Sequence, residues 1–111
     1  MAKRVVKRIA VEAGSGNVFR DLGLADAEEL NIKSGLVIEI TRAVRRLGLT
    51  QEEAGRRMGI SQAKVSGLMS GDFANISESK LMECLNRLGY NIEIKVSPAR
   101  RQVGRRTLAV A

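Results

Sequence analysis

Two glutamines in matching surroundings are the side chains of this sequence whose type and spacing best suit chemistry. Gln51 directly follows Thr50, and Gln62, farther along the chain, directly follows Ser61. A glutamine amide can pair bidentately with the edge of an adenine, and serine and threonine hydroxyl groups can bond to phosphate oxygens. The arrangement indicates recognition through hydrogen bonds, provided that local structure turns both amides toward one surface.

The alternative of catalysis rests on two matches to the spacing Ser-x-x-Lys. Ser61 to Lys64 and Ser77 to Lys80 have the spacing that brings a serine next to a lysine base in penicillin-recognising enzymes. The companion motifs of those enzymes are missing from the sequence, and both serines also suit the N-cap of a helix. We therefore predict that the chain is not an enzyme.

The composition removes most other catalytic and metal-binding chemistry. The 111 residues include one cysteine, Cys84, and no histidine. Disulfide frameworks, zinc-finger spacings, cysteine–histidine dyads and histidine general bases are therefore excluded together. We expect no metal and no cofactor, and we expect Cys84 to pack as a small residue inside a helix.

A capping box predicts the helix that carries the first glutamine. Thr50 is followed three positions later by Glu53, so a helix should begin at Gln51, run to about Met58 and end at Gly59. Backbone N–H groups and the helix dipole favour phosphate near the first turn of such a helix. The first glutamine is therefore expected close to a possible phosphate contact.

Ser61 predicts the cap of a second helix, which should run from Gln62 to about Ser70 and end at Gly71. Two short helices joined by so tight a turn must cross at a steep angle, and Gly55 would let their backbones approach closely. The predicted element is a helix-turn-helix. Both glutamines then lie in the first turn of a capped helix.

The second helix presents small side chains opposite its apolar stripe. At about 100° per residue, Val65, Leu68 and Met69 form the buried stripe, and the opposite face with its flanks carries Gln62, Ala63, Lys64, Ser66, Gly67 and Ser70. Such a face suits close approach to a DNA groove, where alanine can meet a thymine methyl group and lysine can reach guanine or phosphate. The open alternative is a solvated helix face on which Gly67 only weakens the helix, by ~1 kcal/mol.

Apolar spacing predicts two further helices and a strand. A helix that ends at Gly48 should bury Leu36, Ile40, Val44 and Leu47, with Glu39, Arg42 and Arg46 on its other side. A helix capped by Ser77 and ended by Gly89 should bury Ile76, Leu81, Leu85 and Leu88. From Tyr90 to Val96 apolar and polar residues alternate, as in a β-strand. This strand should pair either with a strand predicted over Val5–Val11 or with its copy in a second chain, and we favour the copy.

The excess positive charge lies in the two ends of the chain. Of the net charge of +7, residues 1–25 carry +3, residues 26–96 are neutral, and residues 97–111 carry +4. We expect a basic N-terminal segment with the first strand over 1–15, a DNA-binding domain over 16–97, and a basic, flexible tail over 98–111. Basic ends can contact phosphate or simply remain solvated. Since no apolar run approaches the ~20 residues of a membrane span and no secretory signal is recognisable, we expect a cytoplasmic protein.

The stretch TQEEAGRRMGISQAKVSGLMSG resembles the helix-turn-helix of the Xre family of phage-repressor-like regulators. Residues 16–96 as a whole resemble the HigA-like antitoxin group within it. The resemblance implies a mainly α fold, a helix-turn-helix bundle of about five helices with a C-terminal β-strand. It also implies that Gln51 braces on DNA, that Gln62 reads a base, and that three further residues face bases: Ala63, Ser66 and Gly67.

Residues around the motif are the expected phosphate contacts. They are Arg45 or Arg46, Thr50, Ser61, Lys64, and Asn75 or Lys80. One recognition helix covers little DNA, so we expect a homodimer that reads half-sites roughly 34 Å apart.

These features predict a sequence-specific transcriptional regulator that binds double-stranded DNA at a promoter operator. The resemblance further implies an autoregulatory antitoxin with a RelE-like toxin as partner, for which Asp26–Glu29 and the strand are the expected contact surfaces. Two alternatives stay open: a stand-alone repressor without a toxin partner, and a non-specific nucleic-acid-binding protein that acts through its basic termini.

Overall fold

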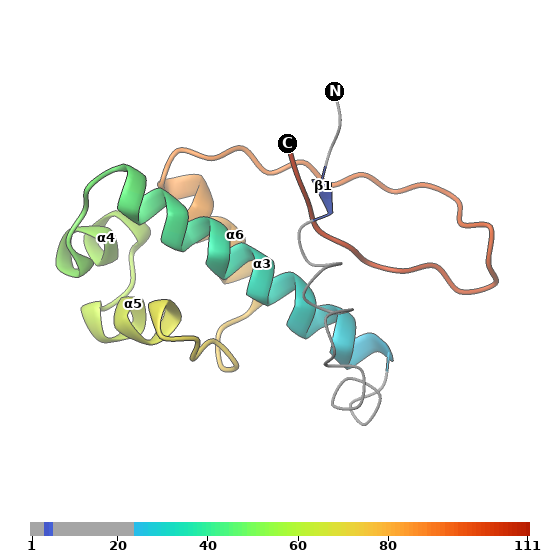
Figure 1. Cartoon of the computed structure of the whole chain (residues 1–111), viewed down its shortest axis with the longest axis horizontal. Helices are drawn as coiled ribbons and strands as arrows, with labels where there is room; N and C mark the ends of the chain where they lie inside the picture. Colours follow the sequence, from blue (N-terminus) through green and yellow to red (C-terminus); the bar gives the residue numbers. More distant parts are fainter. Residues whose placement is uncertain (1–3, 6–23) are drawn as a thin grey trace. The chain divides into compact units, whose positions relative to one another are not determined.

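Four α-helices and one two-stranded sheet form the computed structural model within the residues that it describes, 4–5 and 24–111. The helices are α3 (Leu24–Arg46), α4 (Gln51–Met58), α5 (Gln62–Met69) and α6 (Glu78–Arg87) (Figure 1). The strands β1 (Arg4–Val5) and β2 (Ala109–Val110) pair antiparallel, with Arg4 opposite Val110. The predicted mainly α class is confirmed, whereas the described residues do not confirm the count of about five helices.

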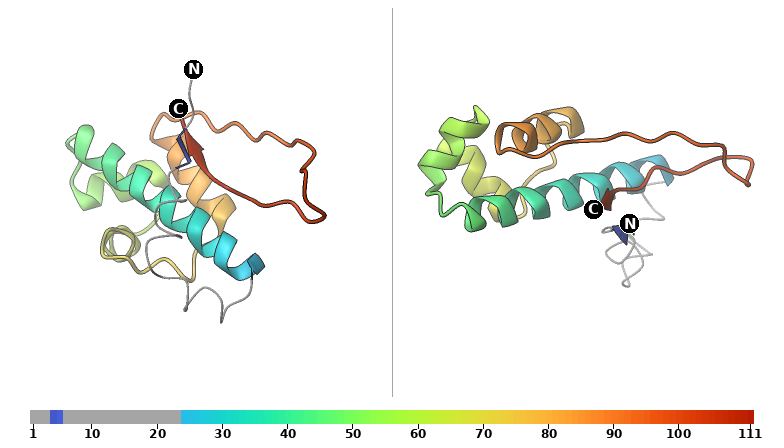
Figure 2. Two further views of the ribbon diagram at one scale, coloured as in Figure 1. Left: turned by 45° about the vertical axis from the view of Figure 1, so that its right-hand side comes forward. Right: turned by 90° about the horizontal axis from the view of Figure 1, so that it is seen from above.

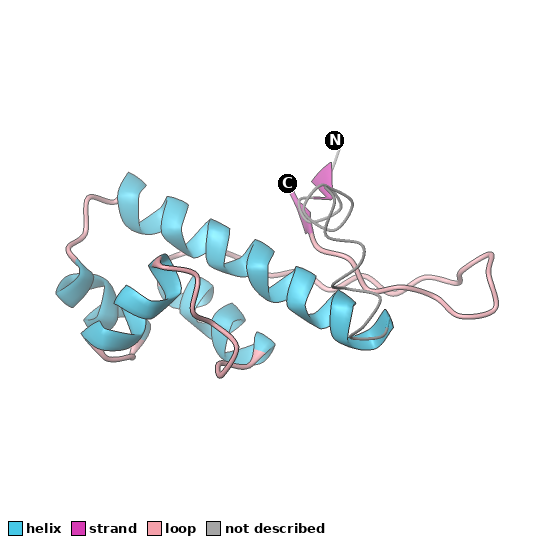
Figure 3. Ribbon diagram, turned by 60° about the horizontal axis from the view of Figure 1, so that its bottom comes forward, coloured by secondary structure: helices cyan, strands magenta, loops and turns pink. Residues whose placement is uncertain are grey.

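The chain divides into two compact units. The helical unit comprises Leu36–Glu93, and the terminal unit comprises Met1–Gly35 with Ile94–Ala111. Within the helical unit, α4 and α5 lie side by side next to the C-terminal end of α3, and a loop connects α5 to α6 (Figures 2 and 3). The helix-turn-helix therefore belongs wholly to the helical unit.

Side-chain caps begin three of the helices at the predicted residues. Thr50 Oγ1 accepts a hydrogen bond from the backbone N–H of Glu53 at 3.1 Å, and Glu53 Oε1 accepts one from the backbone N–H of Thr50 at 2.8 Å. These two bonds complete the predicted capping box of α4. Ser61 and Ser77 cap α5 and α6 in the same way through their hydroxyl oxygens. Because a cap satisfies N–H groups that the helix itself leaves without partners, the sequence determines where each helix begins.

The core of the helical unit takes apolar side chains from all of its helices. They are Leu36, Val37, Ile40, Ala43 and Val44 of α3, Ala54 and Met58 of α4, Val65 and Leu68 of α5, and Leu81, Cys84, Leu85 and Leu88 in and after α6. Most of the predicted stripe residues are buried, although Leu47, Met69 and Ile76 remain half-buried. Burial raises the pKa of the Cys84 thiol, which agrees with its predicted role as a packed small residue.

Close contact between α4 and the turn requires the glycine at position 55. A Cβ atom placed on Gly55 would lie 2.7 Å from the carbonyl oxygen of Ile60 and 3.5 Å from the backbone nitrogen of Gln62. The Gly55 carbonyl also accepts hydrogen bonds from the N–H groups of Gly59 and Ile60, at 2.8 and 3.0 Å. Gly59 itself has a φ of 76°, a left-handed conformation that glycine adopts without strain. The close approach of α4 to the turn thus depends on a backbone-to-backbone contact.

The strand predicted over Tyr90–Val96 is not formed within the chain. Residues 90–96 lie in the described part and contain no strand, and Ile94 and Val96 are 75% and 91% exposed. The described strand of the C-terminal region is instead β2, which pairs with β1. Alternation of apolar and polar residues determines which side chains share a face of a strand. The strand forms only when another strand pairs with it, and alternation does not identify that strand. Most of the strand predicted over Val5–Val11 lies outside the described residues.

One local expectation also changes. Glu39, expected on the exposed side of its helix, is buried and pairs with Arg42 at 3.0 Å. The burial differs from the expectation because a partner neutralises the charge. The segment 98–111 contains β2, and the backbone N–H of Arg106 donates to Glu28 Oε1 at 3.1 Å, while the flexibility of this segment stays a prediction.

Candidate nucleic-acid interface

The face of α5 opposite the core carries short side chains. Val65 and Leu68 are buried, with 1% and 3% of their surface exposed. The α5 residues predicted to contact DNA are exposed or half-buried: Gln62, Ala63, Lys64, Ser66 and Gly67. Apart from the flexible, polar Gln62 and Lys64, the side chains on this face are short and do not hinder the approach of the helix to a groove.

The N-termini of α4 and α5 differ in charge, although both helices begin with a glutamine. Glu52 and Glu53 lie in the first turn of α4, and Glu52 pairs with Arg56 at 3.5 Å. Hydrogen bonding to the backbone and side chain of Thr50 lowers the pKa of the Glu53 carboxyl, so this group is ionised at neutral pH. The first turn of α5 contains no acidic residue. The N-terminus of α5 is therefore the better place for a phosphate or a polarised base edge.

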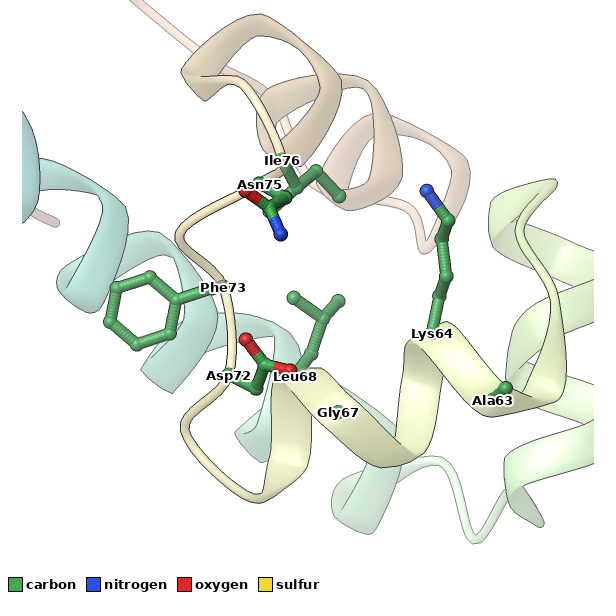
Figure 4. A pocket seen from close by; sticks show the side chains of 8 residues that line it. All are labelled: Ala63, Lys64, Gly67, Leu68, Asp72, Phe73, Asn75 and Ile76. Atoms are coloured by element: carbon green, nitrogen blue, oxygen red, sulfur yellow. The ribbon is translucent and has the colours of Figure 1, made fainter.

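A pocket of about 270 Å³ lies between α5 and the loop that leads to α6 (Figure 4). It brings together four residues predicted to contact DNA: Ala63, Lys64, Gly67 and Asn75. Its other lining residues are Leu68, Asp72, Phe73 and Ile76. We call it the α5 pocket. Its lining combines the apolar side chains of Leu68, Phe73 and Ile76 with the polar side chains of Lys64, Asp72 and Asn75.

Asp72 is the polar lining residue that sequence reasoning missed. Its side chain turns toward the pocket beside Leu68, whereas Lys64 extends along the other edge (Figure 4). The backbone N–H of Asp72 donates to the Gly67 carbonyl at 2.8 Å, which folds the loop back onto the last turn of α5. The available signal was an acidic residue directly after Gly71, the glycine that ends the helix.

The predicted phosphate contacts are in different surroundings. Arg45 and Asn75 are exposed. Arg46 Nη2 donates to Tyr90 Oη at 3.1 Å, and its guanidinium carbon lies 5.6 Å from the centroid of the Tyr90 ring. A guanidinium has five N–H donors, so this bond is compatible with a phosphate contact. Lys80 pairs with Glu83 at 3.5 Å, which leaves it less suited to that role.

The serine of each Ser-x-x-Lys match caps a helix. The hydroxyl oxygens of Ser61 and Ser77 accept from the backbone N–H groups of Lys64 and Lys80, at 3.2 and 3.1 Å. Thr50 is likewise a cap, and Gln51 beside it is half-buried. A capping oxygen can still donate its hydroxyl proton to a phosphate, so the three caps remain compatible with contacts to DNA.

Two comparisons with known proteins agree with this geometry. Residues 18–97 match a family of helix-turn-helix domains, and the chain belongs to this family. A solved structure described as a "Putative XRE Family Transcriptional Regulator" is 32% identical in sequence and superposes with a TM-score of 0.68. The match covers 78% of this chain and 97% of that one. No curated protein matches the chain. In the described residues, no helix is long and apolar enough to cross a membrane.

Proposed function

We propose that the protein is a DNA-binding transcriptional regulator in which α5 enters the major groove and Gln62 reads a base. The observation that carries this proposal is the exposed, short-chained face of α5, which begins with a glutamine and has no carboxylate in its first turn. A two-helix motif of this kind places its second helix in the groove. The similar solved structure is described as a transcriptional regulator, which supports the same role here.

The test is a fluorescence-anisotropy titration at two salt concentrations. The protein is titrated against the DNA upstream of its own gene and against a scrambled duplex of the same composition. We expect a preference of about 10³ or more for the native duplex. Gln62→Ala should reduce this preference, whereas the matched variant Gln102→Ala, outside the helix-turn-helix, should retain it. Equal affinity of the wild-type chain for both duplexes, collapsing with salt, would instead support non-specific binding.

A homodimer is the assembly that we propose for operator binding. The support is the alternating segment 90–96, which is exposed at Ile94 and Val96 and forms no strand among the described residues. Two copies of it could pair across a two-fold axis and present two α5 helices to successive turns of the groove. Analytical ultracentrifugation should give twice the chain mass. Ile94→Lys should return the monomer mass, whereas Val103→Lys, at another exposed apolar residue, should not. A wild-type chain that is monomeric at micromolar concentration and on DNA contradicts this assembly.

The antitoxin role of a HigA-like protein is a narrower proposal and rests on the resemblance of residues 16–96. Its expected contact surface, Asp26–Glu29, forms part of the first turns of α3. The test is to mix the chain with a RelE-like ribonuclease encoded beside its gene and to follow RNA cleavage. Stoichiometric inhibition supports the role. Unchanged cleavage together with operator binding would leave a stand-alone repressor.

A further inference from the structure

We propose that the α5 pocket reads a C·G base pair, with the Asp72 carboxylate accepting a hydrogen bond from the cytosine N4 amino group and Lys64 donating to the guanine. This inference rests on the proposed function and names the base pair that one part of its site recognises. It adds Asp72, a loop residue, to the residues that determine specificity.

The two charged side chains at the pocket complement the groove edge of this base pair. In the major groove, cytosine presents an amino donor, and its guanine partner presents the O6 and N7 acceptors. A carboxylate can only accept and an ammonium can only donate. Asp72 and Lys64 line the same pocket on different sides of Leu68 (Figure 4). One acceptor and one donor on the two sides of Leu68 match the groove edge of a C·G pair, whose guanine offers the lysine two acceptors, whereas the thymine of an A·T pair offers one.

Both charges remain available to a ligand. Within residues 4–5 and 24–111, the ion pairs do not involve Asp72 or Lys64. Both residues are exposed. The carboxylate and the ammonium can therefore meet a ligand without first breaking a bond to one another or to a described neighbour.

Gly67 leaves the surface of α5 beside the Asp72 carboxylate without a side chain. A Cβ atom on Gly67 would lie 3.5 Å from the Asp72 carbonyl oxygen, 3.8 Å from Asp72 Cβ and 3.9 Å from Asp72 Oδ2. The absence of a side chain thus leaves the helix surface open next to the carboxylate. The bond from the Asp72 N–H to the Gly67 carbonyl holds the loop at this distance. A base edge can approach the backbone here more closely than at any position with a longer side chain.

The negative charge of Asp72 favours a role in discrimination rather than in general affinity. A carboxylate beside a recognition helix is repelled by DNA phosphates and lowers affinity for every sequence. The amino donors of the major groove are cytosine N4 and adenine N6, and Asp and Glu characteristically accept from cytosine N4. A carboxylate turned toward the pocket therefore discriminates, because its cost is offset only where such an amino group is present.

The experiment selects duplexes from a library with randomised positions, using the wild-type chain, two test variants and one control variant. Asp72→Asn keeps the shape of the side chain and the backbone bond to Gly67 but adds an amide donor. Lys64→Gln removes the ammonium. Glu83→Gln on α6 is the control for the loss of one negative charge. Thermal unfolding of each variant establishes that it is folded.

We expect the wild-type chain to select a C·G pair at one position. Both Asp72→Asn and Lys64→Gln should weaken the preference at that same position, by between about fivefold and 150-fold. Glu83→Gln should leave the preference unchanged. The inference is overturned if Asp72→Asn raises affinity equally for all duplexes, or if the two variants alter different base pairs. If the wild-type chain selects no duplex at all, the proposed function and the inference both fail. If it selects duplexes but the two variants do not weaken the preference at the same base pair, only the inference fails.

Discussion

Gln51 and Gln62 hold the same position in their helices, but their surroundings give them different capabilities. Gln51 is half-buried and is followed by two glutamates, whereas Gln62 is exposed and is followed by Ala63 and Lys64. A half-buried side chain has fewer conformations open to it, which suits the predicted role of Gln51 in bracing on DNA. An exposed amide beside a positive helix end suits one that reads a base. Capping signals place both residues in the first turn of a helix, but they do not report exposure.

Gly67 provides a prediction that separates folding from binding. Gly67→Ala should raise the stability of the fold by about 1 kcal/mol, because alanine is the better helix former and its Cβ meets Asp72 only at ordinary contact distances. For a domain of this size, the melting temperature should rise by roughly 4–8 °C. Operator affinity should fall, since the added methyl group occupies the pocket side of α5. Calorimetry and anisotropy measure the two effects. If stability rises and operator affinity does not change, DNA does not contact the pocket side of α5.

At the scale of elements, Gly55 predicts the opposite result for the same substitution. Gly55→Ala should destabilise the helical unit by about 1–3 kcal/mol, although alanine favours helices. A Cβ atom would lie 2.7 Å from the Ile60 carbonyl, a backbone atom that cannot rotate away. Urea unfolding of Gly55→Ala and Gly67→Ala measures whether each substitution lowers or raises the free energy of unfolding. An unchanged free energy of unfolding in Gly55→Ala would show that the turn can move away from the added Cβ atom without loss of stability.

The α4 cap makes stability depend on pH. The pKa of the Glu53 carboxyl is lowered in the folded chain, chiefly by the backbone hydrogen bond to Thr50. Stability from this group is therefore present above its ordinary pKa of 4.5 and is lost as the pH falls through the lower, folded value. The difference in melting temperature between wild type and Glu53→Gln should shrink in that range. Glu52→Gln, which removes the same charge without a capping bond, is the control. A difference that does not change with pH contradicts this account.

The elements that sequence could predict are those with local signals. The starts of α4, α5 and α6 were predicted because Thr50, Ser61 and Ser77 bond only three residues away. The strand over 90–96 is not formed within the chain, and Asp72 was missed, because each depends on a partner or a loop path that lies beyond the local sequence. Local chemistry thus defines the helix-turn-helix, and the loop after it completes the pocket.

At the scale of the whole molecule, the basic ends are predicted to add affinity without adding selectivity. Truncation after residue 96 would also remove β2 and the bond from Arg106 to Glu28, so it changes structure as well as charge. Replacing the exposed Arg100, Arg101 and Arg105 with glutamine changes charge alone. The slope of log affinity against log salt should fall by up to about 0.9 for each phosphate that the variant no longer neutralises, with operator preference retained. Loss of the preference itself, measured by anisotropy, would make these arginines the recognition element.

The pairing of β1 with β2 has a consequence for the order of folding. It joins segments about 100 residues apart, and closing a flexible loop of that length costs about 4 kcal/mol. Two residues on each strand cannot offset that cost, because a hydrogen bond contributes only about 1 kcal/mol net. The pair can therefore close only after the helices have shortened the path between the ends. It should be the last contact to form and the first to open, so that opening of β1 and β2 leaves the helix-turn-helix in place.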